Sequence, residues 1–247
     1  MNSFLLILMF FTRINVRKEV DFSEKEFKKG MRKVPLIGII IGAIMAAVFE
    51  LCGFLEINGI LKGVILFTLY IFLTGALHID GFSDTLDGIY SNRDREKTFE
   101  IMKDSRCGAF GVLGMILLSA FYISLFSLVP REAVFLFPIF SRTVILFTCR
   151  KFDYAKEDGM GKIFMDSASY TSFILSIAIL SAVSVMVKDI YILIPFILGF
   201  IITEFRVKKI SDRLSGITGD ILGFSIEYSQ IIFLLIYRIS EMILQKI

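Results

Sequence analysis

The stretch "GILKGVILFTLYIFLTGALHIDGFSDTLDG" (residues 59–88) decides the fold, because in it a long apolar run passes directly into three aspartates. Residues 59–78, as a helix that rises ~1.5 Å per residue, are long enough to cross a hydrocarbon core of ~30 Å. Asp80, Asp84 and Asp87 follow at once. The stretch therefore predicts a transmembrane helix with a cluster of carboxylates at its end.

The composition extends this prediction to the whole chain. Of its 247 residues, 55% are apolar, with a mean hydropathy of +0.74, whereas soluble domains are ~45–50% apolar. Lipid accepts only helices and closed barrels, and the apolar runs are longer than barrel strands. We therefore predict an all-α, polytopic integral membrane bundle with six or seven transmembrane helices. The runs are residues 34–54, 59–78, 109–129, 133–149, 171–187, 190–205 and 221–243, and whether the last one spans fully is left open.

The connections between these runs predict how the chain is oriented. Four long connections hold 21 of the 27 Lys and Arg residues and alternate with very short ones. By the positive-inside rule the long connections face the cytoplasm. We therefore expect a single integral membrane domain over residues 1–247 whose active site faces the cytoplasm. The long connections are residues 1–33, 79–108, 150–170 and 206–220, and the short ones lie near 55–58, 130–132 and 188–189.

The start of the chain, "MNSFLLILMFFTR", has neither the basic segment nor the cleavage site of a signal peptide. It predicts a short apolar helix, interfacial or re-entrant, that ends at Thr12 and Arg13. Elsewhere, three scattered cysteines and a single histidine give no zinc signature and no disulfide framework.

The three aspartates predict a metal site. On a helix that turns ~100° per residue they fall within a wedge of ~60°. Like charges one turn apart destabilise a helix, so such a cluster persists where a cation binds. Oxygen ligands suit a hard divalent ion, and Mg²⁺ commonly uses one or two carboxylates together with substrate phosphates. We predict catalytic Mg²⁺ ligands at Asp80, Asp84 and Asp87; the alternative is a solvated acidic cap.

Basic residues follow in "SNRDREKTFEIMKDSRCGAFG" (residues 91–111). Lys103 and Arg106 beside a metal site suit the recognition of a polyphosphate, and a helix that starts after Gly108 offers backbone N–H groups to an anion. The alternative for residues 93–104 is a solvated amphipathic helix. Upstream, His78 contacts substrate if Gly81 interrupts the helix, and otherwise forms a hydrogen bond at the interface.

A second polar stretch, "SGITGDILGFSIEYSQ" (residues 215–230), opens the last apolar run. Asp220 either caps this helix or serves the active site. Glu227 lies seven residues further, on the same face and deeper, and an acid inside a membrane segment is a functional candidate by default. Three roles are left open for these two acids: binding a second metal, acting as a base, or holding a substrate amide or ribose hydroxyl.

These residues fit two classes of protein, a membrane phosphotransferase and a divalent-cation transporter. A transporter would need acids near the midplane of several spans. Here most acids cluster at one interface, beside lysines and arginines that repel a cation. The phosphotransferase is therefore favoured.

Six motifs resemble the cobalamin synthase family, the adenosylcobinamide-GDP ribazoletransferases, almost from end to end. They are "FFTRINV", "KVPLIGIIIG", "TGALHIDGFSDTLDG", "EIMKDSRCGAFGVLG", "YAKEDGMG" and "SGITGDILGFSIE". The chain departs from the family pattern at Asn15, where Pro is usual, at Ala76 and Ser215, where Gly is common, and at Cys107, where an aliphatic residue is usual. None of these departures removes an ionisable site residue.

The resemblance implies a Mg²⁺-dependent transferase of the cytoplasmic (inner) membrane. Its substrates would be adenosylcobinamide-GDP and α-ribazole, or the 5′-phosphate of α-ribazole, and its products adenosylcobalamin, or its phosphate, and GMP. The CDP-alcohol phosphatidyltransferases, which use interfacial aspartates for the same class of displacement, are a second enzyme hypothesis, although their DGxxAR spacing is absent. We expect a lipid bilayer and no nucleic acid as partner, and leave a homo-oligomer open. The expected substrate-binding residues are Arg13, His78, Lys103, Asp104, Ser105, Arg106, Thr218, Asp220 and Glu227.

Overall fold

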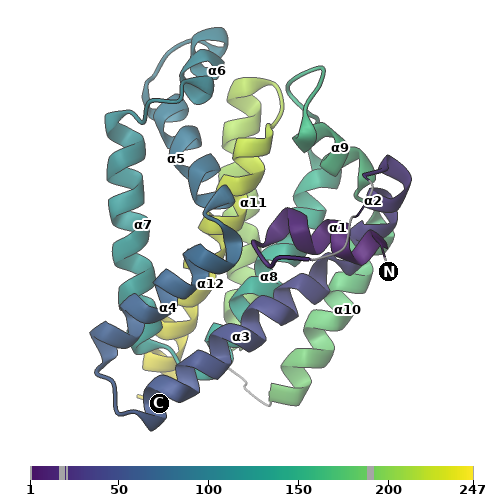
Figure 1. Cartoon of the computed structure of the whole chain (residues 1–247). Coiled ribbons are helices and arrows are strands. Elements are labelled where there is room, and N and C mark those ends of the chain that lie inside the picture. Colours follow the sequence, from purple (N-terminus) through teal and green to yellow (C-terminus); the bar gives the residue numbers. More distant parts are fainter. Residues whose placement is uncertain (1, 17–19, 21, 188–191, 247) are drawn as a thin grey trace.

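The computed structural model describes residues 2–16, 20, 22–187 and 192–246, and the regular elements in this part of the chain are all helices. The long helices form one bundle, and the short helix α1 lies across its side (Figure 1). The elements are α1 (Asn2–Phe11), α2 (Glu24–Gly30), η1 (Met31–Lys33), α3 (Val34–Phe54), α4 (Gly59–Thr74), α5 (Leu77–Tyr90), α6 (Arg95–Lys103), α7 (Ala109–Leu128), α8 (Arg131–Lys151), α9 (Met160–Ser167), α10 (Tyr170–Val187), α11 (Leu193–Leu214) and α12 (Gly219–Leu244).

Five helical segments in the described part are long and apolar enough to cross a membrane, and a sixth crossing results if α4 and α5 count as one broken span. The all-α, multi-pass bundle is thereby confirmed, and six crossings, the lower of the two expected numbers, are present only if α4 and α5 form one span. The predicted run 190–205 is not among these segments, because α11 carries Glu204, Arg206 and Lys208. The first residues of this run and the connection 188–189 lie outside the described part. The five segments are Glu24–Phe54, Ala109–Leu128, Arg131–Lys151, Tyr170–Val187 and Gly219–Leu244.

The predicted continuous span 59–78 is wrong, because α4 ends at Thr74 and the chain bends by 95° into α5. Gly75 and Ala76 form the bend, both in the left-handed region with φ of 67° and 57°. The end of α1 is fixed to it, since the backbone N–H of Arg13 donates to the Leu73 carbonyl oxygen at 2.8 Å. The three aspartates therefore lie on a short separate helix.

The core of the bundle lies around α8. In the apolar 18-residue segment of α8, 83% of the residues are buried, compared with 17% in that of α10. Beside it, α5 packs closely on α12. A Cβ atom added at Gly81 would lie 2.8 Å from the backbone oxygen of Asp220, and one added at Gly223 would lie 3.2 Å from that of His78. Glycine at these two positions lets the backbones approach and places Asp80 near Asp220.

Polar segments gather at one end of the bundle. Figure 1 shows α6 and the α8–α9 and α11–α12 connections at this end, opposite the C-terminus. Two connections pair directly, because Ala155 N donates to Ile217 O and Ile217 N donates to Asp153 O, each at 2.9 Å. Arg95 at the start of α6 donates to the Leu214 and Ala155 carbonyl oxygens at 2.7 and 3.0 Å. Three of the four long connections therefore form one polar end.

Gly75→Ala should lower the melting temperature of the purified protein in lipid nanodiscs. A side chain at φ 67° is strained by about 1–2 kcal/mol, and the added methyl group would meet the Arg13 side chain. Gly53→Ala is the matched control, because no atom lies within 4 Å of a Cβ added at Gly53, and its melting temperature should not fall. Equal melting temperatures for the two variants would contradict this account of the bend.

Candidate functional site

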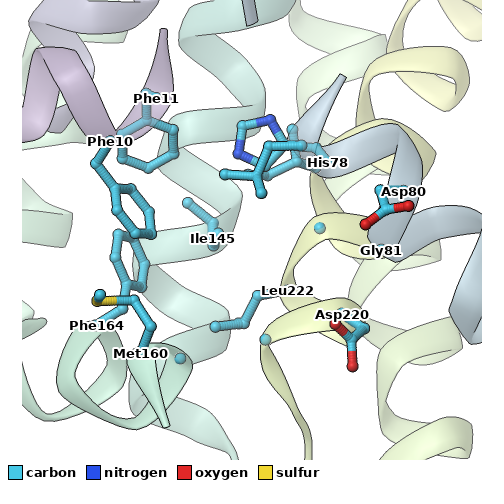
Figure 2. A pocket seen from close by; sticks show the side chains of 15 residues that line it. Phe10, Phe11, His78, Asp80, Gly81, Ile145, Met160, Phe164, Asp220 and Leu222 are labelled. Carbon is cyan, nitrogen blue, oxygen red and sulfur yellow. The ribbon is translucent and has the colours of Figure 1, made fainter. Parts of the chain in front are cut away.

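A cavity of about 200 Å³ lies between α1, α5, α8, α9 and α12 (Figure 2). Of the described residues that line it, only His78, Asp80 and Asp220 have polar side chains. Figure 2 shows Asp80 and Asp220 on one side and an apolar wall on the other. The cavity thus joins a pair of carboxylates to an aromatic surface. The apolar wall consists of Phe10, Phe11, Met160 and Phe164.

The aspartates of α5 differ in their surroundings. Asp80 is exposed, Asp84 is half-buried and Asp87 is buried. Asp84 does not line the cavity, but its carboxyl group experiences the charges of Asp80, Asp220 and Asp87. The helix therefore brings the first two carboxylates towards Asp220 on α12 and directs the third elsewhere.

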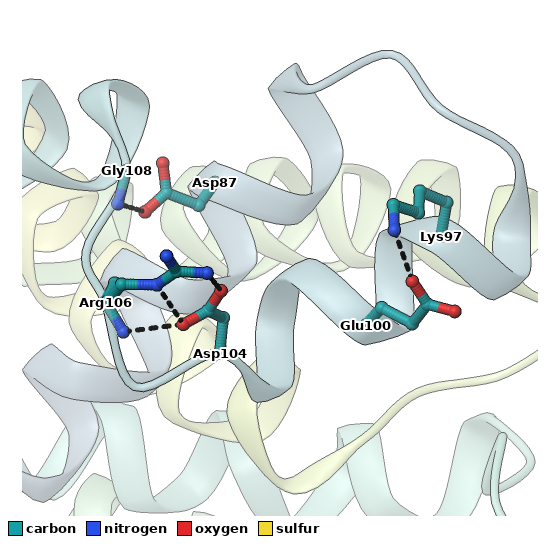
Figure 3. Close-up of polar contacts among 6 residues, drawn as sticks. All are labelled: Asp87, Lys97, Glu100, Asp104, Arg106 and Gly108. Carbon is teal, nitrogen blue, oxygen red and sulfur yellow. Dashed lines mark hydrogen bonds and ion pairs between the residues drawn. The ribbon is translucent and has the colours of Figure 1, made fainter.

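Asp87 binds the start of α7. Its Oδ2 accepts the backbone N–H of Gly108 at 2.7 Å (Figure 3). Its Oδ1 accepts the backbone N–H of Gly111 at 2.8 Å. A carboxylate at a helix N-terminus satisfies unpaired N–H groups and is favoured by the helix dipole. The sequence predicted an anion at this helix start, and in the structure a carboxylate of the protein itself takes that place.

The loop between α6 and α7 is exposed and does not line the cavity. Asp104 Oδ2 accepts Arg106 Nη2 at 2.7 Å, and Asp104 Oδ1 accepts Arg106 Nε at 3.0 Å (Figure 3). These bonds from Arg106 lower the pKa of Asp104 to about 2. Lys103 and Ser105 are also exposed. The loop joins the rest of the site through Asp87, which lies ~10 Å along α5 from Asp80 at ~1.5 Å per residue.

Asp220 is not the cap of α12. The N-cap is Thr218, which is fully buried and whose Oγ1 accepts the N–H of Ile221 at 3.4 Å. The capping hypothesis for Asp220 is therefore wrong. Asp220 lies in the first turn, accepts the Thr218 hydroxyl at 3.3 Å and lines the cavity.

Glu227 is separated from the cavity despite sharing a helix face with Asp220. Its side chain is fully buried, with Oε1 accepting the Tyr70 hydroxyl at 2.7 Å and Oε2 accepting the Tyr122 hydroxyl at 2.6 Å. Glu227 does not line the cavity. Its partners in the bundle are tyrosines that the sequence pattern did not connect with it.

His78 lines the cavity, but the helix break that places it there is not the one that the sequence predicted. The helix is not interrupted at Gly81; the break lies upstream at Gly75, and α5 is continuous from Leu77. His78 is buried, lines the cavity, and its Nδ1 has no hydrogen-bond partner in the described part of the chain. Arg13 is exposed, packs against Gly75 and does not line the cavity.

Sequence reasoning missed the α8–α9 connection. Lys156 lies near enough to Asp220 to attract its carboxylate electrostatically, and its Nζ lies 5.5 Å from the centre of the Phe99 ring. Burial and the charge of Asp220 raise the pKa of Tyr154 in the same connection. Both residues belong to the motif "YAKEDGMG", which the sequence analysis found but to whose residues it assigned no role.

The predicted metal site is not preassembled: within residues 2–16, 20, 22–187 and 192–246, no three His, Cys, Asp or Glu side chains are arranged to hold a metal ion. The donors that converge near the cavity are nevertheless carboxylate oxygens. This donor set fits Mg²⁺, which completes its shell with water and substrate phosphate. The nearest carboxylates are Asp80 and Asp220, which line the cavity, and Asp84, which feels the charge of both.

Comparison with known proteins places the chain among related sequences. The family model described as cobalamin-5-phosphate synthase matches residues 3–238. The chain is similar to a protein of Alkaliphilus oremlandii named adenosylcobinamide-GDP ribazoletransferase, at 39% identity over 95% of this chain and 96% of the relative. Proteins of the same name from Clostridium botulinum (strain Loch Maree / Type A3) and Treponema denticola are 38% and 34% identical, over 96% and 94% of this chain and 97% and 95% of their own. No solved structure matches.

Asp87→Asn should lower the melting temperature, because an amide keeps one carbonyl oxygen for the two N–H groups of α7. The expected loss of stability is about 1–3 kcal/mol. Asp84→Asn is the matched control on the same helix. Asp84 has no hydrogen bond or ion pair with other described residues and is repelled by neighbouring carboxylates, so its replacement should leave the melting temperature unchanged or raise it. A larger loss in Asp84→Asn than in Asp87→Asn, measured by thermal unfolding in nanodiscs, would reverse these assignments.

Proposed function

The chain belongs to the cobalamin-5-phosphate synthase family, and from that premise we propose that this transferase joins adenosylcobinamide-GDP to α-ribazole or α-ribazole 5′-phosphate. A ribose hydroxyl attacks the phosphorus on the cobinamide side, and the bond from that phosphorus to the oxygen of GMP breaks. The attacking hydroxyl is not the one at the 5′ position, because O5′ carries the phosphate both in α-ribazole 5′-phosphate and in its product. The products are adenosylcobalamin, or its 5′-phosphate, and GMP.

The observation that carries the proposal is the meeting of Asp80 on α5 and Asp220 on α12 at one cavity. A carboxylate at this position is suited to accept the proton of the attacking hydroxyl. Mg²⁺ bound here would neutralise charge on the phosphoryl group. We assign its binding to Asp80, Asp84 and Asp220. The earlier assignment of Asp87 is replaced by a positioning role, since both oxygens of Asp87 accept backbone N–H groups.

Cations at the polar end of the bundle would bind the diphosphate. Lys156 already acts on Asp220 from the α8–α9 connection. Lys103 is exposed at the end of α6 and forms no ion pair with another described residue. Arg106 is paired with Asp104, so it must exchange this partner in order to bind phosphate. We therefore place Lys156 and Lys103 ahead of Arg106 as contacts for the leaving GMP.

We also propose that the polar end of the bundle faces the cytoplasm and that the protein resides in the cytoplasmic membrane. The concentration of Lys and Arg in the connections at this end supports that orientation. The phosphatidyltransferase and transporter hypotheses have no comparable support, because the family match and the curated relatives favour the ribazoletransferase.

The test is GMP release by purified protein in lipid, supplied with adenosylcobinamide-GDP and α-ribazole, with and without Mg²⁺. Release should require both substrates and the metal. Asp80→Asn should reduce the rate at least ~100-fold, in line with the loss of a group that stabilises transition-state charge. Asp212→Asn, which removes an exposed ion pair with Lys208 on α11, is the matched control and should retain the rate. GMP release that needs no α-ribazole, or a wild-type rate in Asp80→Asn, would refute the assignment.

A further inference from the structure

We propose that the cavity between α1, α5, α8, α9 and α12 is the subsite for the aromatic base of α-ribazole, with its sugar directed towards Asp80 and Asp220. The inference rests on the proposed function. It adds which substrate enters the cavity and in which orientation.

The size of the cavity limits what enters. Sites that enclose a whole drug-sized ligand measure ~300–1,000 Å³, whereas this cavity measures about 200 Å³. A single bicyclic base fits that space, but a corrin macrocycle with its side chains does not. The corrinoid substrate therefore approaches from outside the cavity, on the side of the carboxylates.

The apolar wall is suited to a flat ring. Phe10 on α1 and Phe164 on α9 stack with their ring centres 5.4 Å apart and their planes at 15°, and Phe11 meets Phe164 edge-on at 5.7 Å (Figure 2). Aromatic side chains bind nucleic-acid bases by stacking on their faces or packing on their edges. Two helices far apart in the sequence, α1 and α9, supply this surface.

Guanine in adenosylcobinamide-GDP and the base of α-ribazole are the two bases in the reaction, and the polar groups on their edges decide which of them suits the cavity. Guanine carries several donors and acceptors, and burying them without partners is costly. The dimethylbenzimidazole base of α-ribazole has a hydrocarbon edge and one unsubstituted ring nitrogen, which is an acceptor. Apart from Asp80 and Asp220, the described cavity lining offers one polar side chain, His78. The base has one acceptor and the lining has one imidazole, so we assign His78 as the donor of the hydrogen bond that this ring nitrogen accepts.

The positions of the lining residues along α12 determine how α-ribazole is oriented in the cavity. Gly219 and Asp220 line the cavity from the first turn, at the polar end of the bundle, and Ile226 lines it from deeper in the helix. A base that occupies the apolar part therefore leaves its ribose at Asp80 and Asp220. There the attacking ribose hydroxyl lies beside the carboxylates proposed to accept its proton.

The experiment measures equilibrium binding of labelled α-ribazole to the full chain in lipid nanodiscs, without the corrinoid substrate. Phe10→Ala removes part of the aromatic wall, and Leu222→Phe fills the cavity. Each should weaken α-ribazole binding about tenfold or more and raise the KM for α-ribazole while the KM for adenosylcobinamide-GDP stays the same. Phe200→Ala is the matched control, because Phe200 is a half-buried aromatic residue that packs on Phe147 outside the cavity. It should bind α-ribazole like the wild type.

Competition on the wild-type protein gives an answer that needs no variant. Unlabelled α-ribazole should displace the label and GMP should not. Displacement by GMP, unchanged α-ribazole binding in both cavity variants, or a rise confined to the KM for adenosylcobinamide-GDP would each overturn the subsite. Failure of the proposed function looks different, because wild-type protein would then bind α-ribazole in this cavity yet release no GMP.

Discussion

The close backbone contact between α5 and α12 is the constraint on which the rest of the site depends. Gly81 and Gly223 allow it, since a side chain at either position would meet the backbone of the other helix. The contact brings together Asp80 and Asp220, which are 140 residues apart in the chain. Two carboxylates so close would repel each other in an empty site, and a bound divalent ion or a shared proton removes that repulsion.

The short helix α5 is fixed at both ends, which explains how it holds the carboxylates in place. At its start, the left-handed residues Gly75 and Ala76 set the bend from α4. At its end, Asp87 accepts two backbone N–H groups from α7. Asp80 and Asp84 lie between these two fixed points. The interior acid Glu227 contributes in a different way, because its bonds to Tyr70 and Tyr122 tie α12 to α4 and α7 below the cavity.

Hydrophobic runs and acidic motifs were sufficient to predict the helical membrane bundle and the segments that meet at the site. They were not sufficient to assign each acid its place. Helical periodicity put Asp80, Asp84 and Asp87 on one face, but neighbouring helices decide what that face meets, so Asp87 binds α7 while Asp80 faces α12. Periodicity likewise could not separate Asp220 from Glu227, because the tyrosine partners of Glu227 come from other helices.

The aromatic wall was beyond prediction for a related reason. In a chain with 26 phenylalanines, composition does not tell which of them face lipid, which fill the core and which line a cavity. Phe10 and Phe164 meet only because α1 lies across the bundle and α9 returns to it (Figure 1). Their pairing is a product of tertiary packing, and it is this packing that gives the site an apolar half beside its carboxylates.

The most direct measurement is Mn²⁺ binding by electron paramagnetic resonance, with adenosylcobinamide-GDP present and Mn²⁺ in place of Mg²⁺. It tests whether Asp80 of α5 and Asp220 of α12 form one site. We expect wild-type protein and Asp212→Asn to bind the ion, and Asp80→Asn and Asp220→Asn to lose the bound signal alike. Wild-type Mn²⁺ binding in Asp220→Asn would contradict a shared site at the α5–α12 contact.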